Sequence, residues 1–145
     1  NGTPGQLAGF VQLGTENKLG DIRNNTSLGI TGVISNEQYQ FQEDKSCAVG
    51  CKQDVKKGKA SILCQLGDKV QEYEVEIEKI NLSSEDNKGM EIHVTDPELL
   101  KKAGGIVQGM SGAPLLQDGK CIGAVTHVFV RDVTRGYATF LENML

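Results

Sequence analysis

The stretch 104–114 constrains this chain more than any other part of its sequence. It reads GGIVQGMSGAP and places Ser111 between Gly109, two positions before it, and Gly112, directly after it. Small neighbours let a substrate carbonyl approach the hydroxyl, and the backbone N–H groups of Gly109 and Ser111 can point at a developing oxyanion. The stretch therefore predicts a nucleophilic serine on a turn, although the same residues also suit an ordinary Gly/Pro turn between strands.

Apolar and polar residues alternate in several segments, which predicts a protein built mainly from strands. In the segment 70–80, Tyr73, Val75 and Ile77 alternate with glutamates, as in a strand with one buried and one solvated face. Further strands are expected at residues 28–34, 59–66, 90–94, 113–117 and 120–130, and a long loop or irregular hairpin at residues 38–57. Residues 137–141 fit either a last strand or the start of a terminal turn. The predicted fold class is all-β, a barrel or a sandwich.

One short helix is expected over residues 96–104. Asp96 suits the N-cap, Pro97 the first helical position and Gly104 the C-terminal stop.

Composition narrows the function classes. The 145 residues suit one domain, and 38% hydrophobic residues with 18 glycines fit a loop-rich β protein with a modest core. A net charge of −4 and the absence of tryptophan argue against nucleic-acid binding. No apolar run approaches the ~20 residues that cross a membrane. Because there is neither an initiator methionine nor a signal-peptide pattern, the chain is expected to be the C-terminal part of a longer precursor.

The four cysteines leave two alternatives open. Cys47, Cys51 and Cys64 could bind zinc, and Cys47 and Cys51 could form a local disulfide. Buried, inert thiols are the simplest expectation for Cys64 and Cys121. No metal or other cofactor is expected.

The pattern around Ser111 is the GxSGxP of double-barrel serine proteases rather than the GxSxG elbow of α/β-hydrolases. The segments 19–22, 88–90, 95–100, 104–130 and the tail 136–145 all resemble the sporulation stage IV B serine peptidases of endospore-forming bacteria. The resemblance therefore covers nearly the whole chain.

The resemblance implies a trypsin-like double β-barrel, of which this chain would form the C-terminal barrel and part of the N-terminal barrel. The implied precursor adds a membrane-spanning signal segment and a PDZ domain upstream. The family acts between the mother-cell and forespore membranes, where it cuts a membrane-bound regulator of an intramembrane protease and so triggers activation of a late sigma factor. The implied partner is therefore a protein substrate, and the membrane is contacted only through the upstream segment.

The resemblance also assigns site residues. Ser111 matches the nucleophile and Asp96 the catalytic aspartate, whereas the catalytic histidine would lie before Asn1. The expected oxyanion hole is the N–H of Gly109 and of Ser111. For Asp96, a helix cap is the alternative role, and the sequence does not decide between the two.

Two histidines remain. Thr126 and His127 lie on the strand after the nucleophile and are expected to bind substrate, although a strand histidine satisfied by its neighbours is equally compatible. A role of His127 as the base is disfavoured by chain order. His93 is expected to be solvated and receives no role.

Two other functions compete with the serine endopeptidase. One is a non-catalytic barrel that binds a peptide in the same cleft and regulates a partner. The other is a structural metal-binding domain that uses Cys47, Cys51 and Cys64.

Overall fold

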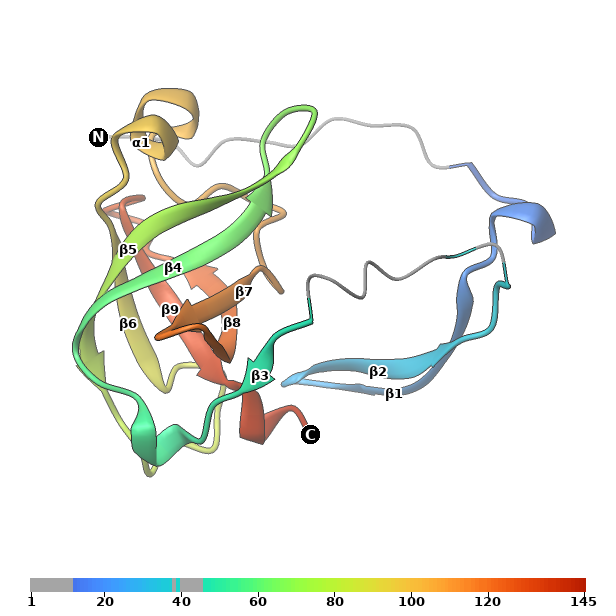
Figure 1. Ribbon diagram of the computed structural model, residues 1–145, viewed down its shortest axis with the longest axis horizontal. Coiled ribbons are helices and arrows are strands. Elements are labelled where there is room, and N and C mark those ends of the chain that lie inside the picture. Colours follow the sequence, from blue (N-terminus) through green and yellow to red (C-terminus); the bar gives the residue numbers. More distant parts are fainter. Residues whose placement is uncertain (1–11, 38, 40–45) are drawn as a thin grey trace.

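The computed structural model describes residues 12–37, 39 and 46–145, and it is mostly β (Figure 1). Its strands are β1 (Gly20–Thr26), β2 (Gly29–Ile34), β3 (Ala48–Val49), β4 (Gly58–Gln65), β5 (Val70–Ile80), β6 (Met90–Val94), β7 (Pro114–Gln117), β8 (Lys120–Val128) and β9 (Arg135–Phe140). The α-helix is α1 (Pro97–Ala103), and the 3-10 turns are η1 (Thr15–Asn17), η3 (Lys52–Asp54) and η4 (Leu141–Asn143).

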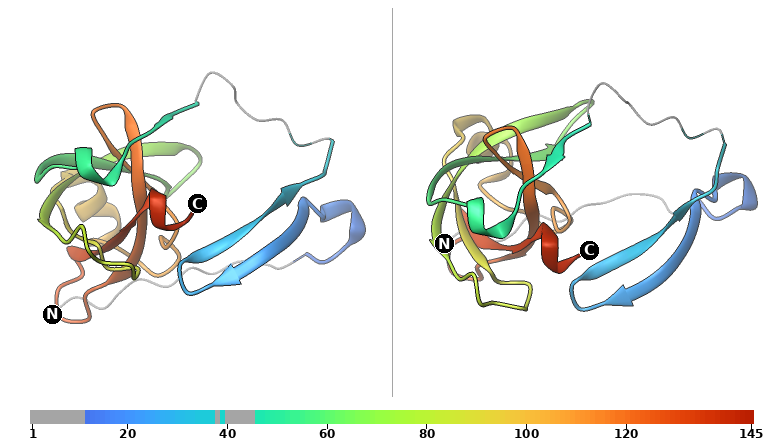
Figure 2. Two further views of the ribbon diagram at one scale, coloured as in Figure 1. Left: turned by 90° about the horizontal axis from the view of Figure 1, so that it is seen from below. Right: turned by 60° about the horizontal axis from the view of Figure 1, so that its bottom comes forward.

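Six strands close into an antiparallel β-barrel. They are hydrogen-bonded in the order β8–β7–β4–β5–β6–β9, and β9 pairs again with β8. The short β3 adds to β8 in parallel at residues 120–121, beyond the part of β8 that pairs with β9. The closed sheet is visible in both views of Figure 2. The expected barrel is therefore confirmed.

The core fills the inside of this barrel. In β5 the side chains of Tyr73, Val75 and Ile77 are buried while the intervening glutamates face outward, as the alternation predicted. Ile62 of β4 and Leu115 of β7 are fully buried beside them. Because each strand contributes one face to a shared interior, the barrel holds the turns at its ends in fixed positions.

A separate hairpin, β1–β2, precedes the barrel. Its two strands pair with each other and, among the described strands, with no other. Figure 1 shows it extending away from the barrel. Its side chains are largely exposed, including the apolar Ile22 and Ile30. The hairpin tip meets the barrel where Asn87 Nδ2 donates a hydrogen bond of 3.3 Å to the carbonyl of Ser27.

The short helix forms as its sequence predicted. Asp96 Oδ1 accepts hydrogen bonds from the N–H groups of Glu98 (2.8 Å) and Leu99 (3.0 Å), and Pro97 occupies the first turn. Gly104 ends the helix in the left-handed region at φ 76°, which a residue without Cβ adopts at little cost.

The disulfide considered for Cys47 and Cys51 is not formed, and all four cysteines are free. The extended β3 lies between these two residues and separates them, and Cys47 Sγ instead lies 3.3 Å from the carbonyl of Gly119. Burial raises the pKa of Cys64 and Cys121, which fits inert thiols. No cluster of three metal-binding side chains occurs among the described residues, so Cys47, Cys51 and Cys64 do not assemble a zinc site.

The segment expected as a loop contains β3 and η3, while residues 38 and 40–45 of it lie outside the described residues. None of the described helices is long and apolar enough to cross a membrane.

Candidate active site

Ser111 lies on an exposed turn between α1 and β7, and the barrel fixes this turn. Gly112 N donates to the carbonyl of Val125 at 2.7 Å, and Ala113 N donates to that of Met110 at 2.9 Å. Gly109 and Gly112 have φ values of 102° and 91°, which residues other than glycine adopt only under strain. The glycines of the motif are thus needed for the backbone path around Ser111.

The backbone N–H groups of Gly109 and Ser111 are available to a ligand. Within the described part of the chain, neither donates a hydrogen bond, although their neighbours Met110 and Gly112 both do. Gly109 and Ser111 line one cavity of about 320 Å³ together. Two unused donors beside an exposed hydroxyl are the arrangement that stabilises the oxyanion of an acyl-transfer intermediate.

The Ser111 hydroxyl itself donates to the carbonyl of Thr126 at 2.8 Å. A backbone carbonyl cannot take the proton that a serine loses when it attacks, so this contact orients the hydroxyl without activating it. Neither His93 nor His127 hydrogen-bonds to Ser111. The described residues therefore supply a positioned hydroxyl and two unused N–H groups beside it, but no base in contact with the hydroxyl. The oxyanion-hole role of these N–H groups stays a prediction.

Met110 shapes the turn that carries these donors, and no sequence pattern singles it out. Its side chain is only 5% exposed. Met110 N donates to the carbonyl of Val107 at 3.1 Å, and Val107 N donates to Met110 Sδ at 3.4 Å. Both contacts close the turn 107–110 and so set the orientation of Gly109 between them.

We expect Met110→Leu in the full-length protein to lower kcat about 10-fold with little change in KM, because a misdirected Gly109 N–H weakens only transition-state binding. Leucine keeps the apolar volume, so the cost in stability should stay below about 1.5 kcal/mol. Steady-state kinetics and thermal unfolding measure the two effects. The control is Met90→Leu, which replaces a methionine buried in the barrel core. Equal kcat and KM values for the two variants would show that Met110 does not influence the site.

Three backbone N–H groups donate hydrogen bonds to the carboxylate of Asp96. Besides its two capping bonds, its Oδ2 accepts a hydrogen bond of 3.1 Å from Glu74 N on β5. Burial alone would raise the pKa of Asp96, but the N–H groups of Leu99, Glu74 and Glu98 outweigh it and hold this pKa below its ordinary value. The carboxylate is thus ionised and serves to fasten α1 to β5.

The structure does not bring Asp96 and Ser111 into one cavity. Asp96 lines a cavity of about 580 Å³ with Glu72 and Glu74, whereas Ser111 lines two other cavities that do not include Asp96. This geometry supports the capping role of Asp96. Its catalytic role, implied by resemblance, stays a prediction.

Substitutions at Asp96 separate these roles. We expect Asp96→Ala to cost about 1 kcal/mol of unfolding free energy and Asp96→Asn less, because asparagine also caps helices. Since the folded-state pKa of Asp96 is depressed, its stabilising effect is present above the unfolded pKa of about 3.9 and is lost as pH falls through the lower folded pKa. Chemical denaturation from pH 7 to pH 2 measures this loss, which should be absent from Asp96→Asn.

The activity of folded Asp96→Asn then decides the second role. Activity near that of the wild type would leave helix capping as the role of Asp96, whereas a loss of about 10⁴-fold would support the catalytic assignment.

Thr126 and His127 lie beside Ser111, as expected for residues of the substrate cleft. The Thr126 hydroxyl is within hydrogen-bonding distance of the carbonyls of Asn87 (2.6 Å) and Tyr137 (3.2 Å), whereas the Thr126 carbonyl accepts the hydrogen bond of Ser111. His127 is exposed and lines both cavities that border Ser111. Their substrate-binding role stays a prediction.

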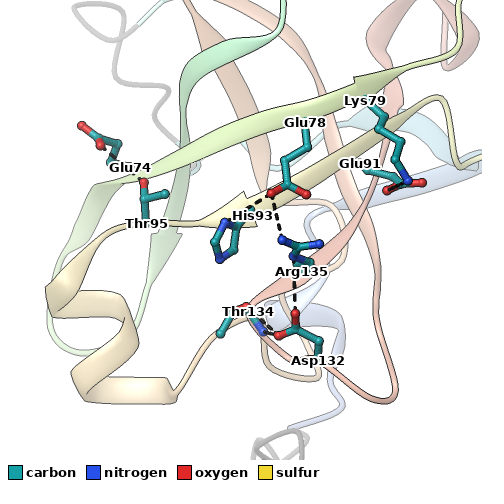
Figure 3. A network of polar contacts seen from close by, with 9 residues as sticks. All are labelled: Glu74, Glu78, Lys79, Glu91, His93, Thr95, Asp132, Thr134 and Arg135. Carbon is teal, nitrogen blue, oxygen red and sulfur yellow. Dashed lines mark hydrogen bonds and ion pairs between the residues drawn. The ribbon is translucent and has the colours of Figure 1, made fainter.

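His93 lies elsewhere, in a network of polar contacts on the outside of the barrel (Figure 3). Its Nδ1 lies 3.4 Å from Glu78 Oε1, which also accepts from Arg135 Nη2 at 3.1 Å. Arg135 in turn contacts Asp132 at 3.4 Å, next to the loop whose Val133 carbonyl binds Ile106 N. His93 is thus half-buried and paired rather than freely solvated, and it lines neither cavity at Ser111.

The closed six-stranded barrel places the protein among those with a trypsin-like serine protease fold. The crystal structure of the Rv3671c protease from M. tuberculosis in its active form is similar, with a TM-score of 0.57 and 16% sequence identity. The similarity covers 86% of this chain and 54% of that chain, so this chain spans about half the length of that protease. At this identity the likeness concerns the fold alone.

The family described as SpoIVB peptidase S55 matches residues 1–145, and the chain belongs to this family. No curated protein matches it in sequence. The chain is therefore a domain of the SpoIVB peptidase S55 family with a serine protease fold.

Proposed function

We propose that this chain is the nucleophile-bearing part of a serine endopeptidase that cleaves a membrane-bound regulator of an intramembrane protease during sporulation. The site of action is the space between the forespore and mother-cell membranes, and the cut leads to activation of a late sigma factor. One observation carries the peptidase assignment: the exposed Ser111 hydroxyl lies beside two backbone N–H groups, of Gly109 and Ser111, that the described residues leave unused.

The mechanism follows from this arrangement. Ser111 Oγ bonds to the carbonyl carbon of the substrate while its proton passes to a base, and the carbonyl oxygen becomes an oxyanion held by the two N–H groups. The intermediate collapses, the C–N bond breaks, and the leaving amine takes the proton from the base. Water then hydrolyses the acyl-enzyme by the same two steps. The base we propose is a histidine outside residues 1–145, as the family resemblance implies.

A cleavage assay on membranes tests this function. Full-length protein is added to membrane vesicles from cells arrested in sporulation before sigma-factor activation, and new protein N-termini are identified by mass spectrometry. We expect a new terminus in a membrane-bound regulator that is absent with Ser111→Ala. Cleavage that is the same with both proteins, or no new terminus, would refute the proposal.

A non-catalytic peptide-binding barrel is the second candidate. The observation that favours it is the contact between the Ser111 hydroxyl and the Thr126 carbonyl, which occupies the proton that catalysis must remove. A barrel of this kind would bind peptides and leave Ser111 unreactive towards a fluorophosphonate, which labels only an activated serine.

A further inference from the structure

The cavity of about 320 Å³ beside Ser111 is apolar at its base. Ile106 and Val125, which are 2% and 1% exposed, line it together with the half-buried Val107 and Val128. The exposed side chains of Gln108 and His127 stand at its rim. None of the residues that line this cavity carries a carboxylate, an ammonium or a guanidinium group.

The position of the oxyanion donors shows which part of a substrate reaches this cavity. Gly109 and Ser111 both line it, whereas the second cavity at Ser111, of about 460 Å³, is bordered by Ser111 and the hairpin tip but not by Gly109. The carbonyl oxygen that the two N–H groups would bind belongs to the residue on the acyl side of the cut. The side chain of that residue starts two bonds from the carbonyl carbon, so the cavity of 320 Å³, which both donors line, is the one within its reach.

The edge of β8 next to Ser111 is suited to hold the peptide backbone. The last residue pair of β7 with β8 is Pro114 with Ala124, and β7 pairs with no residue of β8 beyond it. The other edge of β8 continues to pair with β9 at His127 and Val128. An extended peptide can therefore add to residues 126–128 as a further strand, which places its side chains alternately into and away from the cavity.

We propose that this cavity is a specificity pocket that selects an aliphatic side chain on the residue whose carbonyl Ser111 attacks. The inference rests on the proposed function, because it takes Ser111 as the nucleophile. An aliphatic side chain gains from leaving water for the apolar base formed by Ile106 and Val125. A charged side chain would lose its hydration there without finding an opposite charge.

Binding of product peptides tests the pocket without requiring catalysis. The protein is full-length Ser111→Ala, which keeps both N–H donors, and the probes are fluorescent hexapeptides that differ only in a C-terminal leucine, valine, lysine or aspartate. Their terminal carboxylate stands in for the oxyanion. By fluorescence anisotropy, we expect the leucine and valine peptides to bind at least ~10-fold more tightly than the lysine and aspartate peptides.

Two variants change the expected selectivity. Val128→Asp places a carboxylate in the pocket and should make the lysine peptide the tightest ligand. Gln108→Glu does the same from the exposed rim, at less risk to folding, and should raise lysine-peptide affinity several-fold. The control Val130→Asp alters a valine that is 87% exposed and does not line the cavity, and it should leave the order unchanged.

The outcomes separate the pocket from the proposed function. Equal affinities for all four peptides, tighter binding of the lysine or aspartate peptide, or no binding would overturn the specificity pocket. Aliphatic selectivity without fluorophosphonate labelling of the wild type would keep the pocket and overturn the peptidase function. Fluorophosphonate labelling of the wild type without aliphatic selectivity would keep the peptidase function and overturn the pocket.

Discussion

Ser111→Ala in the full-length protein is expected to lower peptidase activity by at least about 10⁴-fold, because removal of the nucleophile leaves only substrate binding and the oxyanion donors. The barrel should stay folded, since the substitution removes one exposed hydroxyl and its single hydrogen bond to Thr126, worth about 1 kcal/mol. Peptide hydrolysis and thermal unfolding of the purified protein measure the two effects.

The matched control is Ser83→Ala. Ser83 is also exposed and also donates one hydrogen bond of 2.8 Å, to Asn81 Oδ1, but it lies in the loop between β5 and β6. Activity of Ser111→Ala within a few-fold of that of Ser83→Ala would show that Ser111 is an ordinary turn residue.

Residues 1–145 expressed alone are expected to show no hydrolysis above that of the same chain with Ser111→Ala. Neither of the two histidines contacts the Ser111 hydroxyl, and without a base a serine triad loses nearly all of its acceleration. Addition of the upstream segment in trans should restore Ser111-dependent hydrolysis. Robust hydrolysis by the isolated chain would instead make His127 or His93 the base.

The same isolated chain should self-associate through the β1–β2 hairpin. Ile22 and Ile30 are 64% and 60% exposed, and the outer edges of β1 and β2 pair with no other described strand. Exposed apolar strand edges pair readily with other chains. Sedimentation velocity should show dimers or larger species that the combined substitution Ile22→Glu and Ile30→Glu converts to monomer. A wild-type chain that stays monomeric at high concentration would contradict this expectation.

Much of the barrel was predictable because its strands carry a period that burial imposes. The alternation in β5 and the cap and stop residues of α1 each specify one local structure. The strand β1 was missed because its sequence GDIRNNT has no alternation, and its pairing with β2 buries almost none of it. The short β3 was missed because it is held by its partner β8 rather than by its own residues.

The site was predictable where the backbone itself is constrained. The glycines around Ser111 predict a turn with positive φ, and Gly109 and Gly112 both have positive φ values. The role of Met110 could not be foreseen, because it depends on the contact of its sulfur with Val107 N inside the turn. The relation between Asp96 and Ser111 is a matter of tertiary structure, and spacing along the chain does not determine it.

The claim that Ser111 is an activated nucleophile is tested most directly by fluorophosphonate labelling of the full-length protein, with the modified residue mapped by mass spectrometry. We predict one label, on Ser111, that is absent from Ser111→Ala and retained in His127→Ala. A folded wild-type protein that takes up no label, or takes it up on another serine, would show that Ser111 is not an activated nucleophile.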